Sequence, residues 1–171
     1  APRIMGAARA GNYMARTAVI AGVGPGLGES LARKFIDEGC QVGLFARSTG
    51  YLDELSTELG SQAVAVPTDI TDEDRVEDAF EEVRDAFGPV DVLLNHASGA
   101  AWKGARDISP GEFEQAWRVS AQGALLCCQQ AIEDMDDGGT IIFTGATSAV
   151  RGRDGAVGFS AAKLAGRGMA G

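Results

Sequence analysis

The feature that most constrains this chain is the regular alternation of short apolar runs with longer amphipathic segments. Five runs rich in β-branched and apolar residues predict buried strands, and helical spacing of apolar residues predicts a helix after each of them. The predicted strands cover 17–21, 41–46, 63–66, 90–94 and 140–144. The predicted helices cover 27–38, 49–59, 71–87, 109–135 and a segment that begins near 158. Strands joined by helical crossovers form parallel sheets covered on both faces, so we expect a doubly wound α/β fold with helices on both faces.

Local signals set several of the helix ends. Thr71, with Asp74 three residues later, is typical of a helix N-cap, and Ser109 before Pro110 is another. The chain has 171 residues and neither an internal repeat nor a low-complexity linker, so we expect one domain over 17–171. Residues 1–16 are interpreted as a native extension or an added remnant, with Met14 as a candidate start and without the apolar run of a secretory signal.

Charge and cysteine content narrow the expected partners. The net charge is −9, and an acidic surface repels phosphate backbones and anionic lipid, so neither nucleic acid nor a membrane is expected as a partner. No apolar stretch approaches the roughly 20 residues that span a bilayer. Cys40, Cys127 and Cys128 lack metal-ligand spacing and are interpreted as small buried apolar residues in a reducing cytoplasm. No metal site is expected.

A glycine run, Gly22-Val23-Gly24-Pro25-Gly26-Leu27-Gly28, lies between the first predicted strand and the first predicted helix. A pyrophosphate needs backbone that it can approach closely and a helix N-terminus with free N–H groups. At the first strand–helix junction of a βαβ pattern, such a run indicates a dinucleotide site. The alternative is a tight turn without a ligand.

The spacing Gly22-x-x-x-Gly26-x-Gly28 resembles that of the short-chain dehydrogenase/reductase family, and further segments resemble the family in the same order. These are Thr68-Asp69-Ile70, Asn95-His96-Ala97-Ser98, Phe143-Thr144-Gly145-Ala146 and Phe159-Ser160-Ala161-Ala162-Lys163. The resemblance implies a Rossmann-type fold that lacks the family's last elements, and a homo-oligomer, dimer or tetramer, acting on a small-molecule substrate. It implies that the dinucleotide is held by Gly22, Gly26, Leu27, Gly28, Arg47, Asp69, Ile70, Asn95, Ala97 and Lys163.

The end of the second predicted strand bears on the choice of cofactor. A carboxylate there would bind the ribose 2′-hydroxyl of NAD, but this chain has Ala46 followed by Arg47. An arginine can pair with a 2′-phosphate, so we expect NADP(H), with NAD(H) less favoured. The alternative is that Arg47 is only a solvated loop residue.

The catalytic positions that the resemblance implies are largely changed. The family's tyrosine, serine and asparagine correspond here to Phe159, Ala146 and Ser120, and only the lysine is kept, as Lys163. A positioned acid or base contributes about 10²- to 10⁴-fold, so this loss is severe for carbonyl chemistry. Some reductases of the family that act on carbon–carbon double bonds also lack the tyrosine.

Other polar residues are candidates for proton transfer. His96 follows the fourth predicted strand, and Thr147, Ser148, Ser160 and Lys103 belong to nearby segments. The competing interpretation of His96 is a structural histidine. Three functions therefore stay open: an NADP(H)-dependent oxidoreductase acting on a carbonyl, alcohol or activated double bond, an inactive dinucleotide-binding scaffold or sensor, and a structural subunit.

Overall fold

A single parallel sheet organises the computed structural model, which describes residues 15–170. The sheet has the order β3-β2-β1-β4-β5, and every neighbouring pair is parallel. Its strands are β1 (Thr17–Ala21), β2 (Gln41–Ala46), β3 (Ala63–Pro67), β4 (Val90–Asn95) and β5 (Thr140–Phe143). The predicted doubly wound α/β architecture is confirmed. The interpretation of residues 1–16 as an extension falls almost wholly outside the described residues.

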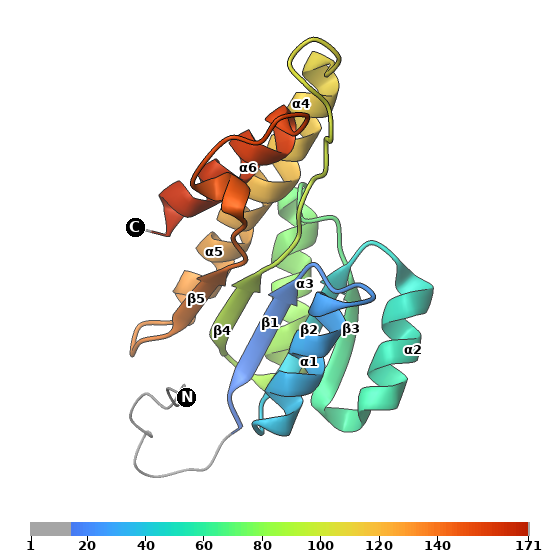
Figure 1. Cartoon of the computed structure of the whole chain (residues 1–171). Helices are drawn as coiled ribbons and strands as arrows, with labels where there is room; N and C mark the ends of the chain where they lie inside the picture. The colour runs from blue at the N-terminus through green and yellow to red at the C-terminus, as the bar shows by residue number, and fades with distance from the viewer. Residues whose placement is uncertain (1–14, 171) are drawn as a thin grey trace.

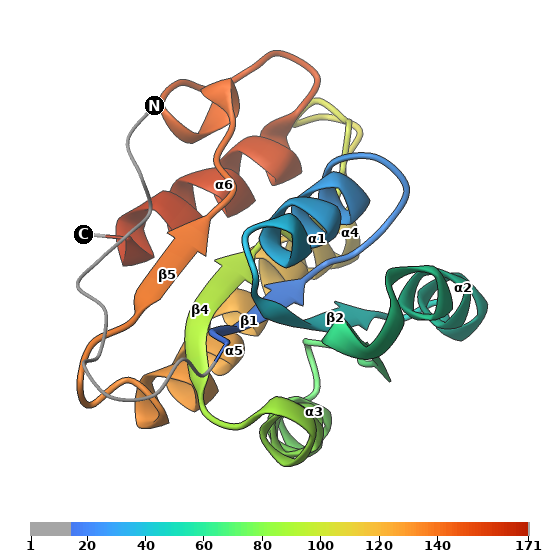
Figure 2. The same cartoon turned by 90° about the horizontal axis from the view of Figure 1, so that it is seen from below.

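The helices lie on both faces of this sheet. They are α1 (Leu27–Asp37), α2 (Thr49–Leu59), α3 (Glu73–Phe87), α4 (Pro110–Trp117), α5 (Gly123–Glu133) and α6 (Val157–Met169). Figure 2, which looks along the sheet, shows α1 on one face and α3 on the other. In Figure 1 the strand arrows point toward α4 and α6, which lie beyond the carboxyl ends of β1, β4 and β5.

Two apolar layers hold the sheet between its helices. On one face Ile20 and Leu44 pack with Leu52 of α2, and on the other Phe45 meets Phe80 of α3 edge-on, with ring centroids 5.4 Å apart. Alternate residues of a strand point to opposite faces, which is why neighbours such as Leu44 and Phe45 enter different layers. The central strands β1, β2 and β4 are therefore buried on both faces, as expected for a parallel sheet, while the edge strands β3 and β5 are mostly half-buried.

The start of one helix differs from the sequence prediction, and the start of another agrees with it. The N-cap of α3 is Asp72 and not Thr71, because the Thr71 hydroxyl donates to the carboxylate of Asp69 while Asp72 accepts from the Arg75 amide. The predicted N-cap Ser109 of α4 is confirmed, and the structure adds Glu112, which completes a capping box with it.

The long helix expected over 109–135 is divided by a π-helical segment, Arg118–Gln122, between α4 and α5. Within this segment the Ser120 hydroxyl accepts from the Gly99 amide. At the following residue, a Cβ on Gly123 would lie 2.7 Å from the side chain of Ile70. Such single π turns inside helices often occur at functional sites. Here it brings the helix and the loop after β4 into direct contact.

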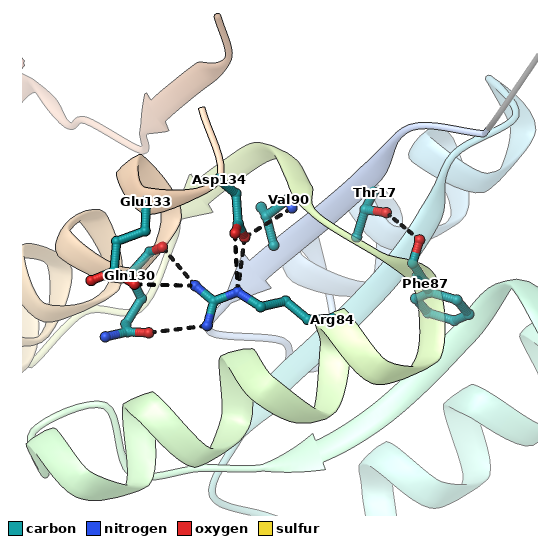
Figure 3. Close-up of polar contacts among 7 residues, drawn as sticks. All are labelled: Thr17, Arg84, Phe87, Val90, Gln130, Glu133 and Asp134. Atoms are coloured by element: carbon teal, nitrogen blue, oxygen red, sulfur yellow. Dashed lines mark hydrogen bonds and ion pairs between the residues drawn. The ribbon is translucent and has the colours of Figure 1, made fainter. Parts of the chain in front are cut away.

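A polar cluster joins α3 to α5 at the amino ends of the strands (Figure 3). Arg84 donates from Nε to both carboxylate oxygens of Asp134, 3.0 and 3.1 Å away, and from Nη2 to the Gln130 carbonyl. Asp134 also accepts from the Val90 amide at the start of β4. This cluster stabilises the end of the sheet opposite the glycine turn and leaves the carboxyl ends of the strands for other roles.

Candidate functional site

The carboxyl ends of the strands meet in one row. Ala21, Asn95 and Phe143 are paired across β1, β4 and β5, so the residues that follow them, Gly22, His96 and Thr144, lie along the same edge. The chain order reverses between β1 and β4, and in open parallel sheets ligands bind outside the carboxyl ends at such a point. The predicted site residues therefore converge on the position where this fold class binds ligands.

The glycine turn is packed too tightly for side chains at two of its positions. Gly22 has φ +111°, and a Cβ there would lie 2.3 Å from the Ala97 amide nitrogen. A Cβ on Gly28 would lie 2.8 Å from the Gly22 carbonyl oxygen. These two glycines allow β1, α1 and the loop after β4 to approach one another, as a dinucleotide turn requires.

The outer side of the same turn borders open space. A Cβ on Gly24 or Gly26 would meet no atom within 4 Å, and Gly26 is the N-cap of α1 with φ +109°. None of the described side chains caps this helix. The amides of Leu27 and Gly28 are in its first turn, where no preceding helical carbonyl is available to accept a hydrogen bond. The turn thus presents unobstructed backbone and a helix N-terminus, and this arrangement fits a pyrophosphate.

Beside the turn, Arg47 and Asp69 follow β2 and β3. Arg47 is exposed, and Asp69 accepts from both the amide and the hydroxyl of Thr71. These bonds, with smaller contributions from the positive charges of Arg47 and Arg75, lower the pKa of Asp69. Ile70 is buried. The structure therefore brings a cation, a carboxylate and an apolar side chain to the edge next to the glycine turn.

Asn95, at the end of β4, carries an unpaired acceptor. Its Nδ2 donates to Cys128 Sγ at 3.3 Å, while its buried Oδ1 has no partner among the described residues. Asn95 lines a cavity of about 240 Å³ together with Ser120, Ala146 and Lys163. A buried unpaired acceptor costs free energy, so a donor from a water or a ligand is expected there.

Lys163 lies in α6 and points back to the end of β5. Its Nζ donates to the Thr144 carbonyl oxygen at 2.9 Å, and the side chain is buried. Burial lowers the pKa of this ammonium, because the charged form loses solvation in the interior. Lys163 is thus held as a buried cation at the cavity wall.

The positions of the missing hydroxyls lie beside this lysine. Phe159 is one helical turn before Lys163, whose Nζ is 5.9 Å from the centre of the phenyl ring. Ala146 lines the same cavity as Lys163, and Ser120 uses its hydroxyl as the acceptor for the Gly99 amide. Of the three changed positions, only Ser120 therefore has a hydroxyl at the site.

A tryptophan covers Phe159. The indole of Trp102, in the loop between β4 and α4, stacks on the phenyl ring with centroids 4.6 Å apart and planes 28° apart. The guanidinium of Arg153 lies 5.6 Å from the centre of the indole. The backbone amide of Val157 at the start of α6 donates to the Lys103 carbonyl, which keeps this loop against the helix. Sequence reasoning missed Trp102, although a single large aromatic within Gly99-Ala100-Ala101-Trp102-Lys103 was a usable signal.

The substitute proton donors differ in their surroundings. Lys103 pairs with Glu112 on the surface of α4, and the Ser160 hydroxyl accepts from the Arg153 amide. Ser148 is buried and Thr147 is exposed in the short turn after β5. None of these four lines the cavity next to Lys163.

His96 is half-buried at the same edge, with Nδ1 3.1 Å from the Thr144 hydroxyl. Burial and the charge of Lys163 lower its pKa, so the imidazole is neutral near pH 7. Thr144 therefore links His96 through its hydroxyl and Lys163 through its carbonyl oxygen.

The three cysteines are buried in the structure. Cys40, Cys127 and Cys128 are buried and unpaired, and burial raises the pKa of the Cys127 thiol to about 12. Within residues 15–170, no group of three or more His, Cys, Asp or Glu is arranged to hold a metal ion. None of the helices in that range is long and apolar enough to cross a bilayer.

Comparison with known proteins identifies the family. A family model described as short chain dehydrogenase matches residues 16–171. The chain belongs to this family. Its relatives include a versicolorin reductase from Emericella nidulans, 27% identical over 142 residues, which cover 80% of this chain and 54% of that protein. A tetrahydroxynaphthalene reductase from Pestalotiopsis fici is 26% identical over 141 residues, which cover 80% and 51%.

Among solved structures, a 3-ketoacyl-(acyl-carrier-protein) reductase from Brucella melitensis complexed with NADH has a similar fold. The TM-score is 0.82 at 29% sequence identity, and the match covers 87% of this chain and 64% of that one. The chain spans about half the length of the relatives named above. The family relationship thus agrees with the parallel α/β fold described above.

Proposed function

We propose that this chain is an NADP(H)-dependent oxidoreductase with a divergent proton-transfer site, acting on a small carbonyl, alcohol or activated double bond. The observation that carries the proposal is the unobstructed glycine turn at the N-terminus of α1, aligned with a buried, carboxylate-free Lys163 at the same sheet edge. The first feature fits a pyrophosphate and the second fits an uncharged polar group such as a ribose hydroxyl.

Each part of the cofactor has candidate partners in this proposal. The turn of Gly22, Gly26, Leu27 and Gly28 would hold the pyrophosphate, while Asp69 and Ile70 would border the adenine. Asn95, Ala97 and Lys163 would hold the nicotinamide ribose, and the unpaired Oδ1 of Asn95 supports a donor at that place. The nicotinamide would supply the electron pair and hydrogen of the reaction. The protein's own contribution is to orient the cofactor and exclude water.

Preference for NADP(H) over NAD(H) is proposed from Arg47. No acidic side chain stands at Ala46, where a carboxylate would bind a ribose 2′-hydroxyl, and the exposed guanidinium that follows can pair with a phosphate. The positive charge of Arg47 contributes to the lowered pKa of Asp69, so the two side chains lie close enough to border the adenosine part of the proposed cofactor together. The Brucella relative is described with NADH, so a titration with both cofactors tests this point directly.

A second function, an inactive NADP(H)-binding scaffold or sensor, is favoured by the absence of hydroxyls at Phe159 and Ala146. We also propose a homo-oligomer, dimer or tetramer, in a cytoplasmic setting. The oligomer is supported by exposed apolar side chains on α4, α5 and α6, namely Trp117, Leu125, Ile132 and Leu164.

Fluorescence titration of NADPH tests cofactor binding, with Lys163→Met as the variant and Lys34→Met, on the exposed side of α1, as the matched control. We expect Lys163→Met to weaken binding by about tenfold, as loss of a charge-assisted hydrogen bond does, and Lys34→Met to leave it unchanged. Equal affinities for all three proteins would contradict the role of Lys163. Failure of the unaltered chain to bind NADPH would contradict the proposed function.

A further inference from the structure

The one histidine of the chain lies in the row of residues at the carboxyl ends of the strands. Gly22, His96 and Thr144 follow residues that are paired across β1, β4 and β5, so His96 stands between the glycine turn and the end of β5. Its amide donates to the Ala21 carbonyl oxygen at 2.9 Å, and the Thr144 amide donates to the Asn95 carbonyl oxygen at the same distance. Backbone bonds on both sides therefore fix His96 beside the place proposed for the cofactor.

The two ring nitrogens of His96 have different surroundings. Nδ1 lies 3.1 Å from the Thr144 hydroxyl, whereas Nε2 has no hydrogen-bond partner among the residues that the structure describes. Within 15–170, Asn95 Oδ1 is the buried side-chain atom left without a partner, so Nε2 is open to solvent. When Nδ1 carries the proton and donates to Thr144, Nε2 keeps the lone pair that a base needs. One nitrogen is thus oriented and the other is available, as in a general base.

The other polar groups at this edge are poorer proton acceptors. The Lys163 ammonium has no lone pair, and it donates to the Thr144 carbonyl oxygen. The Ser120 hydroxyl accepts from the Gly99 amide, and no basic side chain in the described part of the chain bonds to it. A hydroxyl without such a partner is a weak base and a weak acid near neutral pH. His96 is therefore the group of this edge that is suited to accept a proton.

The charges around the imidazole favour its neutral form. Burial, and to a smaller extent the positive charge of Lys163 on α6, lower the pKa of His96. The glycine turn over 22–28, the loop over 97–102 and the end of β5 over 143–149 contain no ionisable side chain. The imidazole is therefore unprotonated at pH 7, and it readily releases a proton that it has accepted.

From this geometry we propose that His96 is the general base of the site, taking the hydroxyl proton of a small alcohol on Nε2 while Thr144 orients its ring. This inference rests on the proposed function. In the step, the O–H bond of the alcohol breaks and its proton moves to Nε2. The carbon that bears the hydroxyl loses its hydrogen with the electron pair to NADP⁺, and the C–O bond becomes a carbonyl. The alcohol is oxidised, NADP⁺ is reduced to NADPH, and the proton on Nε2 passes to solvent.

Chemical modification tests the position of His96 without turnover. Diethyl pyrocarbonate acylates unprotonated imidazole, and the product is followed by its ultraviolet absorbance. Because the chain has one histidine, the protein prepared without a histidine tag should gain one acylated imidazole, and His96→Gln should gain none. The rate should rise with pH around a midpoint below 6.5. NADP⁺ at about ten times its Kd should slow the reaction about tenfold, as a ligand that covers the ring does.

Kinetics with a panel of small primary and secondary alcohols and NADP⁺ test the chemical role. For the fastest alcohol we expect His96→Gln to lower kcat by about 10²- to 10⁴-fold, to leave the Kd of NADP⁺ unchanged, and to abolish the rise of kcat/KM with pH near the pKa of His96. Thr144→Val should also lower kcat, and Thr144→Ser, which keeps the hydroxyl, should restore it. Thr140→Val, at the exposed start of β5, is the matched control and should keep the original rate.

The outcomes distinguish this inference from the proposed function. If NADP⁺ binds but does not protect His96, or no alcohol of the panel is oxidised, the role of His96 as the base is overturned and cofactor binding stands. The same holds if His96→Gln keeps the rate and the pH profile, or weakens NADP⁺ binding without lowering kcat. Absence of NADP⁺ and NADPH binding, measured first by calorimetry, would overturn the proposed function and this inference with it.

Discussion

Replacing Gly22 by alanine tests whether the glycine turn is required by packing or only by the ligand. The new Cβ would lie 2.3 Å from the Ala97 nitrogen and 2.5 Å from its Cα, whereas carbon atoms in contact stay about 3.5 Å apart. The loop after β4 would have to move by about 1 Å. That loop is fixed by the His96 and Ala97 amides, which donate to the Ala21 carbonyl at 2.9 and 2.6 Å.

Two costs add at this position. Overpacking a well-packed site costs about 1 to 3 kcal/mol, and a non-glycine residue in a sparsely populated backbone region costs a similar amount. Gly22 has φ +111°, outside the range of ordinary side-chain-bearing residues. We therefore expect Gly22→Ala to lower the free energy of unfolding by about 4 kcal/mol, a large part of the 5 to 15 kcal/mol typical of a domain.

Urea unfolding of the cofactor-free protein, followed by circular dichroism, measures this change. Gly24→Ala is the matched control, because it lies in the same turn, a Cβ there meets no atom within 4 Å, and its φ is not positive. We expect the control to stay within about 0.5 kcal/mol of the original chain, or to be slightly more stable. If Gly22→Ala unfolds at the same urea concentration as Gly24→Ala, the packing argument is refuted.

Two further predictions concern charges. Arg84→Leu leaves the nearly buried Asp134 without its cation, so the free energy of unfolding measured with urea should fall by about 2 to 3 kcal/mol. The control Glu58→Gln removes an exposed ion pair and should lower that free energy by less than about 1 kcal/mol. Equal losses in the two variants would contradict the argument from burial. His96 has a lowered pKa in the folded chain, so the unfolded chain binds the proton more strongly, and stability should fall as pH drops below about 6.5. His96→Gln should show a smaller fall between about pH 8 and pH 5.5, and parallel curves for the two proteins would contradict this.

Local sequence was enough to predict the strands and most helix ends. The runs that form β1 and β2 match the prediction residue for residue, because strands buried on both faces need continuous apolar residues. Ser109 and Glu112 cap α4 through atoms only three residues apart. The glycine spacing was readable for the same reason, since the conformation of a turn depends on residues within it.

The remainder was decided by residues far apart in the chain. Thr71 does not cap α3, because its hydroxyl donates to Asp69 instead. The π-helical segment lies where the Ser120 hydroxyl accepts from the Gly99 amide in the loop after β4. The sequence also predicted that hydroxyls are missing at Phe159 and Ala146, but it did not predict what lies there instead. Only the tertiary structure stacks Trp102 on Phe159 and buries Lys163 against Thr144, because loop, strand and helix meet at the sheet edge only after the strands have paired.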